Sequence, residues 1–243
     1  MNLRSLSTSM MTFAIAIACV GCKVVPGRPG PAEERPEQVL QFATLYEQNC
    51  AACHGASGKN GAAISLANPV YLAVAGVGNL QRITADGVPG TLMPAFAKSQ
   101  GGMLTDQQIA VIAQGLETQW GKADALGGQT APTYASSAAG DPVQGQKAYA
   151  TFCASCHGAD GTGAAHGNKR TGSLVDPAYL ALISDQGLRS LIIAGKPEEG
   201  MPDWRSHKSE AGLQAMTDQE VNDTVAWLAS HRIAMPGQPY VHP

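Results

Sequence analysis

Two copies of a cysteine–histidine motif carry the most specific chemistry in this chain of 243 residues. Each copy has two cysteines separated by two residues and followed at once by histidine and glycine, at residues 50–55 (CAACHG) and 153–158 (CASCHG). Two thiols at this spacing on one helical turn can bond to the two vinyl groups of a haem, and the next imidazole then reaches the iron. The motifs therefore predict two covalently bound haem c groups. The expected attachment residues are Cys50, Cys53, Cys153 and Cys156, with His54 and His157 as iron ligands.

Other uses of paired cysteines explain this pattern less well. A four-cysteine zinc site would place the two pairs about 15–20 residues apart and would give the histidines no role. A thioredoxin-like redox pair needs a strand–helix setting, which the sequence does not indicate. Simple disulfides would not require His and Gly after each pair. Haem attachment is the interpretation that uses every residue of the motif.

The two motifs lie in a tandem duplication. The offset between the copies is 103 residues at the motifs, 108 from Ser65 and Ser173 onward, and 112 from Thr105 and Thr217 onward. The second copy thus carries about nine extra residues in two loops. Insertions of this kind lie on surfaces.

The duplication also selects a second iron ligand in each copy. The first copy offers Met93 and Met103 and the second offers Met201, Met216 and Met235, but only Met93 and Met201 superpose. Both precede a proline, which favours an extended loop over a helix. We therefore expect Met93 and Met201 to bind iron, and we interpret Met216 as a core residue.

Four histidines after the second motif have no counterpart in the first copy, and we expect them on the surface: His166, His207, His231 and His242. His166 is a separate case, because it lies in the inserted loop near the second haem motif. Its replacement of Met201 as a ligand would change the chemistry of that site.

Helical signals dominate both copies. Thr105-x-x-Gln108 and Thr217-x-x-Glu220 are capping boxes, and apolar residues follow each at helical spacing. These apolar residues are Ile109, Ile112, Ala113 and Leu116 in the first copy and Val221, Val225 and Leu228 in the second.

Further helix signals come from prolines and glycines. Asn68, Asp141 and Asp176 each stand before a proline, as helix N-caps do, and Gly195 ends another apolar helix pattern. No convincing alternating strand is present. The prediction is an all-α fold of two domains.

The amino terminus has the pattern of an export signal. An apolar run at residues 10–20 is followed by Gly21 and Cys22, as in the signal of a bacterial lipoprotein whose cysteine is acylated. A proline-rich, charged segment at residues 23–38 follows and predicts an extended tether. We expect residues 1–22 to be the signal, Cys22 to carry lipid, and the protein to lie on the periplasmic side of a bacterial membrane.

These boundaries divide the remaining chain into four parts. We expect domain 1 at residues 39–122, a flexible Gly-, Ala-, Ser- and Thr-rich linker at 123–139, domain 2 at 140–235 and a tail at 236–243. Aromatic residues make up only 5% of the chain and charged residues 14%. Two haem macrocycles would occupy the interior that Phe and Trp fill in other proteins.

Each copy resembles a class I cytochrome c domain. The resemblance covers residues of about 39–121 and 140–235 and includes the methionine loops LMPAF at 92–96 and GMPDW at 200–204, with Tyr46 and Tyr149 as the aromatic residues before the motifs. It implies two tandem domains, each wrapped around one covalent haem, whose closing helix crosses the amino-terminal helix.

The sequence departs from the family pattern in two places. Phe42 stands where domain 2 has the small Gly145, so we expect a less close helix crossing in domain 1. Ile64 and Gly172 stand near the place where the family often has a proline whose carbonyl holds the ligand histidine. A backbone carbonyl there is expected to take that role.

A His/Met pair leaves no open iron position, so electron transfer is expected and enzyme activity is not. The expected partners are redox proteins, such as a quinol-oxidising complex, a terminal oxidase, a reaction centre or another cytochrome. A net charge of −3 lacks the basic excess that nucleic-acid binding needs. Residues 140–235 hold 11 acids and eight bases, whereas 39–122 hold four of each, which predicts a lower potential for haem 2. The alternative is a peroxidase-like dihaem enzyme with one haem that lacks Met ligation.

Overall fold

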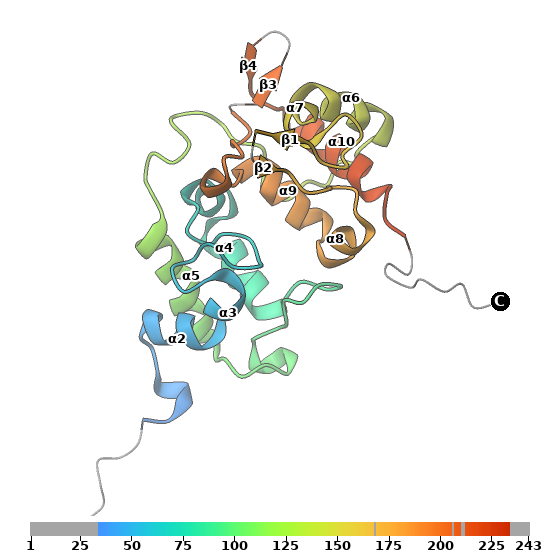
Figure 1. Ribbon diagram of the computed structural model, residues 1–243. Coiled ribbons are helices and arrows are strands. Elements are labelled where there is room, and N and C mark those ends of the chain that lie inside the picture. Colours follow the sequence, from blue (N-terminus) through green and yellow to red (C-terminus); the bar gives the residue numbers. More distant parts are fainter. Residues whose placement is uncertain (1–33, 168, 206, 210–211, 234–243) are drawn as a thin grey trace, which may run out of the picture. The chain divides into compact units, whose positions relative to one another are not determined.

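The computed structural model describes residues 34–167, 169–205, 207–209 and 212–233 (Figure 1). The predicted signal, Cys22, most of the tether and the tail at 236–243 lie outside these residues. The described residues up to 38 and those from 39 onward belong to separate units. In the first unit, residues 34–38 are exposed and Pro36–Gln38 form the 3-10 turn η1. Among the described residues, no helix combines the length and the apolar character that a membrane crossing requires.

Domain 1 is helical. Its elements are α2 (Phe42–Asn49), α3 (Ala51–His54), α4 (Pro69–Asp86), the 3-10 turn η2 (Lys98–Gln100) and α5 (Asp106–Trp120). Helix α5 packs against both α4 and α2. Helix α4 bends at Gly76, whose φ of 66° and ψ of 156° interrupt the helical backbone. Helix α4 therefore consists of two short helical stretches, whereas the sequence around Pro69 predicted a single one.

Domain 2 repeats this order. Its helices are α6 (Pro142–Phe152), α7 (Ala154–His157), α8 (Pro177–Leu182), α9 (Asp185–Ala194) and α10 (Asp218–Ala229), with the 3-10 turn η3 (Pro197–Glu199) after α9. Helices α6 and α10 pack against each other (Figure 1). Ser184, the counterpart of Gly76, is the N-cap of α9, so the bend in α4 corresponds to the break between α8 and α9.

Both insertions of the second copy contain a short antiparallel hairpin. Strand β1 (Ala165–His166) pairs with β2 (Lys169–Arg170), and β3 (His207–Ser209) pairs with β4 (Gly212–Gln214). The all-α prediction is confirmed for the architecture, and these two hairpins are additions to it. Strands of two or three residues are too short to leave an alternating pattern in the sequence.

The predicted helix ends are confirmed. Thr105 and Thr217 form complete capping boxes with Gln108 and Glu220. The side chains of Asn68, Asp141 and Asp176 accept hydrogen bonds from the first turns of α4, α6 and α8. These local contacts set where each helix begins.

The predicted core positions of the two closing helices are also confirmed, since all seven are buried: Ile109, Ile112, Ala113, Leu116, Val221, Val225 and Leu228. Met216 is 3% exposed and belongs to the core, as we interpreted it. Met103, in contrast, is 80% exposed.

The segment expected to be a flexible linker is held in place in its middle part. The Arg189 guanidinium, 4% exposed, donates to the carbonyls of Thr133 and Tyr134. The Thr133 amide donates to a carboxylate oxygen of Asp218 at 2.7 Å, and the Tyr134 side chain is buried. The expectation of flexibility rested on the composition of residues 123–139, which carries no information about these distant partners.

Candidate haem-binding sites

Each cysteine motif forms one helical turn, as predicted. Cys50 and Cys153 are the N-caps of α3 and α7, and each histidine is the last residue of its turn. Cys50 and Cys153 are partly buried, whereas Cys53 and Cys156 are exposed. In the described part of the chain, none of these four cysteines forms a disulfide.

The environment of the inner cysteines disfavours thiol–disulfide chemistry. Burial, with a smaller effect from Cys53, raises the pKa of Cys50 to about 11. Burial and Cys156 raise the pKa of Cys153 to about 12. Redox-active cysteines need a lowered pKa, because the thiolate is the reactive species. The thioredoxin-like alternative therefore finds no support here.

The imidazole of His54 is buried and oriented by a backbone carbonyl. Its Nδ1 lies 2.7 Å from the Ile64 oxygen, and the residue is 8% exposed. Burial lowers the pKa of His54, although the bond to Ile64 acts in the opposite direction. The carbonyl can only accept, so Nδ1 carries the proton and Nε2 has the lone pair that a metal would bind. The carbonyl expected near residue 64 is confirmed in domain 1.

The corresponding loop of domain 2 follows a different path because of its inserted hairpin. The Gly163 amide donates to the His157 carbonyl at 2.9 Å, and the Thr171 hydroxyl donates to the Cys156 carbonyl at 2.6 Å. In domain 1, the Ala63 amide donates to the Cys53 carbonyl instead. The backbone of His166 lies in β1, but its side chain is outside the described structure, so its possible role as a ligand stays a prediction.

A tyrosine hydroxyl holds the glycine after each histidine. Tyr46 donates to the Gly55 carbonyl at 2.8 Å, and Tyr149 donates to the Gly158 carbonyl at 2.7 Å. Sequence reasoning assigned these residues only an aromatic place before the motif. The signal that could have indicated the hydroxyl is the recurrence of Tyr, and not Phe, at both positions.

The two methionine loops have the same construction. Gly87 ends α4 and Gly195 ends α9, with φ values of 68° and 67°. A β-carbon on either glycine would lie within 2.8 Å of the carbonyl oxygen of Met93 or Met201. Both methionine residues are partly buried. A glycine is required where each helix meets its methionine loop, because the backbones touch and φ is positive.

Hydrogen bonds fix the start of each loop in the same way. The Val88 amide donates to the Met93 carbonyl at 3.0 Å, and the Lys196 amide donates to the Met201 carbonyl at 3.0 Å. The structure thus places the cysteines and histidine of each copy on one turn and the methionine on a separate loop, which touches a helix-ending glycine in both copies. Imidazole and thioether are the iron ligands of a class I haem c site and the cysteine sulfurs are its attachment groups, so the residues fit that group.

Comparisons with known proteins agree with this donor set. Residues 142–232 match the family model described as Cytochrome c, and residues 37–114 match the model described as Cytochrome C oxidase, cbb3-type, subunit III. The chain is 29% identical over 147 residues to the Cbb3-type cytochrome c oxidase subunit CcoP of Azospirillum sp. (strain B510). That alignment covers 54% of this chain and 45% of the relative, so less than half of the relative's length is matched.

A solved structure, the reducing HAO-like protein complex of Kuenenia stuttgartiensis, has a chain with a weaker likeness. The identity is 16% and the TM-score 0.42, over 85% of this chain and 100% of that one. A TM-score this low assigns no fold and no activity.

Proposed function

We propose that this chain, which belongs to the class I cytochrome c family and holds two covalent haem c groups, transfers electrons as a dihaem subunit of a membrane-bound respiratory complex. Cys50 and Cys53 would hold the first haem and Cys153 and Cys156 the second. His54 and His157 would bind iron on one face. The haem groups, when bound, supply one-electron exchange between ferrous and ferric iron.

The matching glycine–methionine contact in both copies carries this proposal. In each copy the glycine that ends a helix touches the backbone of the methionine loop, which supports corresponding roles for Met93 and Met201. A methionine on the second iron face leaves no position for an exogenous ligand, and thioether sulfur raises the potential. A methionine ligand in both copies suits the passage of electrons, whereas a dihaem enzyme needs one haem without it.

Location and partners form the finer part of the proposal. The signal pattern before Cys22 supports export and a lipid anchor, and the tether at 23–38 would let the haem domains reach a partner on the periplasmic side. The CcoP relative favours an oxidase as the complex that receives the electrons. A tethered carrier that shuttles between complexes is the other form of the same activity.

The ligand assignment is tested by the methionine–iron charge-transfer band of the oxidised protein. We expect a band intensity that corresponds to two haems, and a loss of half of it in Met93→His and in Met201→His, because a second imidazole keeps iron six-coordinate without the sulfur. Met103→His is the matched control, since this side chain is 80% exposed and should leave the band unchanged.

A parent band of half the intensity, with carbon monoxide binding to one reduced haem, would instead support the peroxidase-like alternative. His166 would then be tested by His166→Ala, which should restore the band if His166 displaces Met201. The complex itself is tested by mild solubilisation of membranes. Comigration of the two haems with an oxidase activity supports the subunit, and migration of the chain alone supports a carrier.

A further inference from the structure

We propose that Asn68 of domain 1 is a positioning residue for the Met201 loop of domain 2. The inference rests on the proposed function, because it takes Met201 as an iron ligand. It adds that the ligand of the second haem is held in part from the first domain, so the two haem sites do not act independently.

The Asn68 side chain is 4% exposed and uses both ends of its amide. Its oxygen accepts the amides of Val70 and Tyr71 at 3.0 and 3.3 Å, which caps α4. Its nitrogen donates to the carbonyls of Ala194 and Gly195 at 3.0 and 3.3 Å. Carbonyls at a helix end have no partner within the helix, so a donor from outside satisfies them. Asn68 therefore joins the start of α4 to the end of α9.

The end of α9 is in direct contact with the methionine loop. A β-carbon at Gly195 would stand 2.5 Å from the Pro202 oxygen and 2.7 Å from the Met201 oxygen, so the two backbones touch. The next residue, Lys196, exchanges two backbone hydrogen bonds with Met201, at 3.0 and 3.1 Å. A displacement of the Gly195 carbonyl therefore reaches Met201 through one residue.

Helix α9 is also contacted by the segment between the domains, so the Asn68 bond is one of several contacts that hold α9. Arg189, in the middle of α9, binds the carbonyls of Thr133 and Tyr134 from the segment between the domains. Burial and, to a smaller extent, the neighbouring Tyr134 hydroxyl raise the pKa of Tyr71, which lies in the first turn of α4 beside Asn68. The same two helices are thus bridged directly and through the linker.

Capping alone does not explain an asparagine at position 68. Its counterpart Asp176 caps α8 by accepting the Tyr179 amide at 2.9 Å, and a carboxylate has no proton to donate. Ser, Thr and Asp cap helices about as well as Asn does. The property that separates Asn68 from those residues is its N–H₂ group, and that group makes the bonds to domain 2.

The test compares Asn68→Ser with Asn79→Ser in the full dihaem chain. Serine keeps the cap at position 68 but is too short to reach α9. The Asn79 amide nitrogen donates to the Ala75 carbonyl at 2.9 Å, and its oxygen accepts from Arg82 at 3.2 Å, so both bonds lie within α4. Asn79→Ser therefore removes an amide donor that makes no hydrogen bond to domain 2. In a Met93→His background the methionine–iron band reports haem 2 alone, and in a Met201→His background it reports haem 1 alone.

The readout is the fraction of each haem that has lost its methionine as temperature rises. We expect Asn68→Ser to increase that fraction for haem 2 by roughly two- to ten-fold, the factor associated with one neutral hydrogen bond. It should leave haem 1 unchanged, and Asn79→Ser should leave haem 2 unchanged.

Three results would overturn the inference. The first is no change at haem 2, and the second is an equal change at haem 1, which would mean that Asn68 acts only on the stability of its own domain. The third is an equal change at haem 2 in Asn79→Ser. Failure of the proposed function has a separate signature, because the Met93→His chain would then show no band at all before any change at position 68.

Discussion

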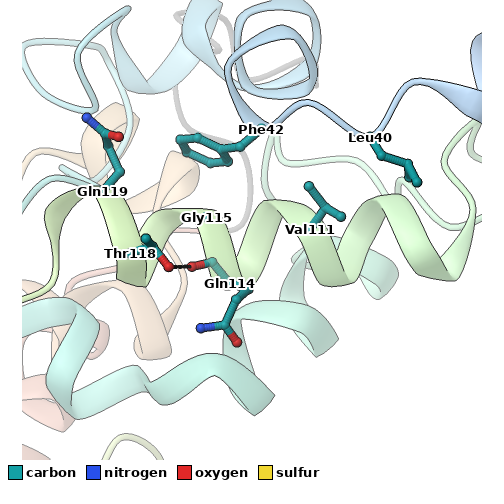
Figure 2. Close-up of a pocket in the computed structure, with 7 residues that line it drawn as sticks. All are labelled: Leu40, Phe42, Val111, Gln114, Gly115, Thr118 and Gln119. Atoms are coloured by element: carbon teal, nitrogen blue, oxygen red, sulfur yellow. Dashed lines mark hydrogen bonds between the residues drawn. The ribbon is translucent and has the colours of Figure 1, made fainter.

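The ring of Phe42 in α2 lies against the α-carbon of Gly115 in α5 (Figure 2), so close that a β-carbon at position 115 would stand 2.1 Å from the ring atom Cδ2. Domain 2 has the reverse arrangement. There Gly145 belongs to the amino-terminal helix and Trp227 to the closing helix, and a β-carbon at 145 would stand 2.8 Å from the Trp227 Cβ. Each domain pairs one glycine with one aromatic residue, but the two helices exchange the roles.

This exchange explains how domain 1 accommodates Phe42. The expected looser crossing is present, because a β-carbon at Gly145 would meet the backbone of the facing helix at Asp223, whereas one at Gly115 would meet only the Phe42 side chain. Beside the crossing is an open pocket of about 360 Å³, lined by Leu40, Phe42, Val111, Gln114, Gly115, Thr118 and Gln119 (Figure 2). Because residue 115 is a glycine, the Phe42 ring can lie against the backbone of α5.

The first prediction concerns these glycines. Gly115→Ala should reduce the free energy of unfolding by about 1–3 kcal/mol, the usual cost of overpacking a closed contact. Gly145→Ala should do the same, since its β-carbon would meet the Asp223 carbonyl oxygen at 1.9 Å. Guanidinium unfolding followed by far-ultraviolet circular dichroism measures both. Gly78→Ala in α4 is the control, because it has no atom within 4 Å of the added carbon and should be neutral or stabilising. Equal stability of Gly115→Ala and the control would show that the ring moves aside without cost.

The second prediction concerns the tyrosine hydroxyls beside the cysteine motifs. Tyr46→Phe removes the donor to the Gly55 carbonyl and should reduce the free energy of unfolding by about 0.5–1.5 kcal/mol. Tyr149→Phe should act similarly at Gly158. Tyr46→Leu also removes the ring that lies 5.1 Å from the Trp120 ring, so its effect should be larger. Thermal unfolding of the three variants separates the hydroxyl from the ring. If Tyr46→Phe matches Tyr46→Leu, the ring contributes nothing.

Sequence reasoning was most successful where neighbours along the chain determine the structure. The haem motif, the capping boxes and the N-cap before each proline all depend on residues within four positions of one another. The duplication added a second source of information, since it singled out Met93 and Met201 before any geometry was known.

Long-range partners could not be predicted in the same way. Arg189 binds a carbonyl 56 residues away, and Asn68 binds one 126 residues away. Nothing in the local sequence of the linker predicts that the Arg189 guanidinium binds its carbonyls. The pairing of Phe42 with Gly115, and of Gly145 with Trp227, is also non-local. The two residues of each pair meet only because helices far apart in the sequence cross each other.

The third prediction concerns the carboxylate that helps to hold the linker. Burial raises the pKa of Asp218, but the Thr133 amide and the Arg189 guanidinium outweigh that effect and bring the pKa below its ordinary value of 3.8. A lowered pKa means that Asp218 stabilises the folded form above about pH 4, and that this stabilisation is lost as pH falls through the folded pKa.

This pH dependence can be measured through the Thr133 amide resonance in the reduced, diamagnetic protein. Its shift should follow the titration of Asp218 on the acid side of the ordinary value. Asp218→Asn should remove the titration, and Arg189→Gln should move it toward higher pH, because the guanidinium favours the charged carboxylate. If the midpoint of the titration is the same in Arg189→Gln as in the unaltered chain, the 2.5 Å ion pair between Arg189 and Asp218 does not stabilise the carboxylate.

The last prediction is that haem 2 has the lower potential. The excess of acids in residues 140–235 stabilises ferric iron, whereas residues 39–122 carry balanced charge. Glu198 is exposed three residues before Met201, so Glu198→Gln should raise the potential of haem 2, and the difference between the haems should narrow at high salt. Glu47→Gln, at an exposed position of α2, is the equal charge change in domain 1 and should change the potential of haem 1 instead. Spectroelectrochemical titration measures the potentials of both haems, and the Met93→His chain shows which of the two transitions belongs to haem 1. A higher potential for haem 2 in the unaltered chain would mean that haem exposure or local hydrogen bonding outweighs net charge.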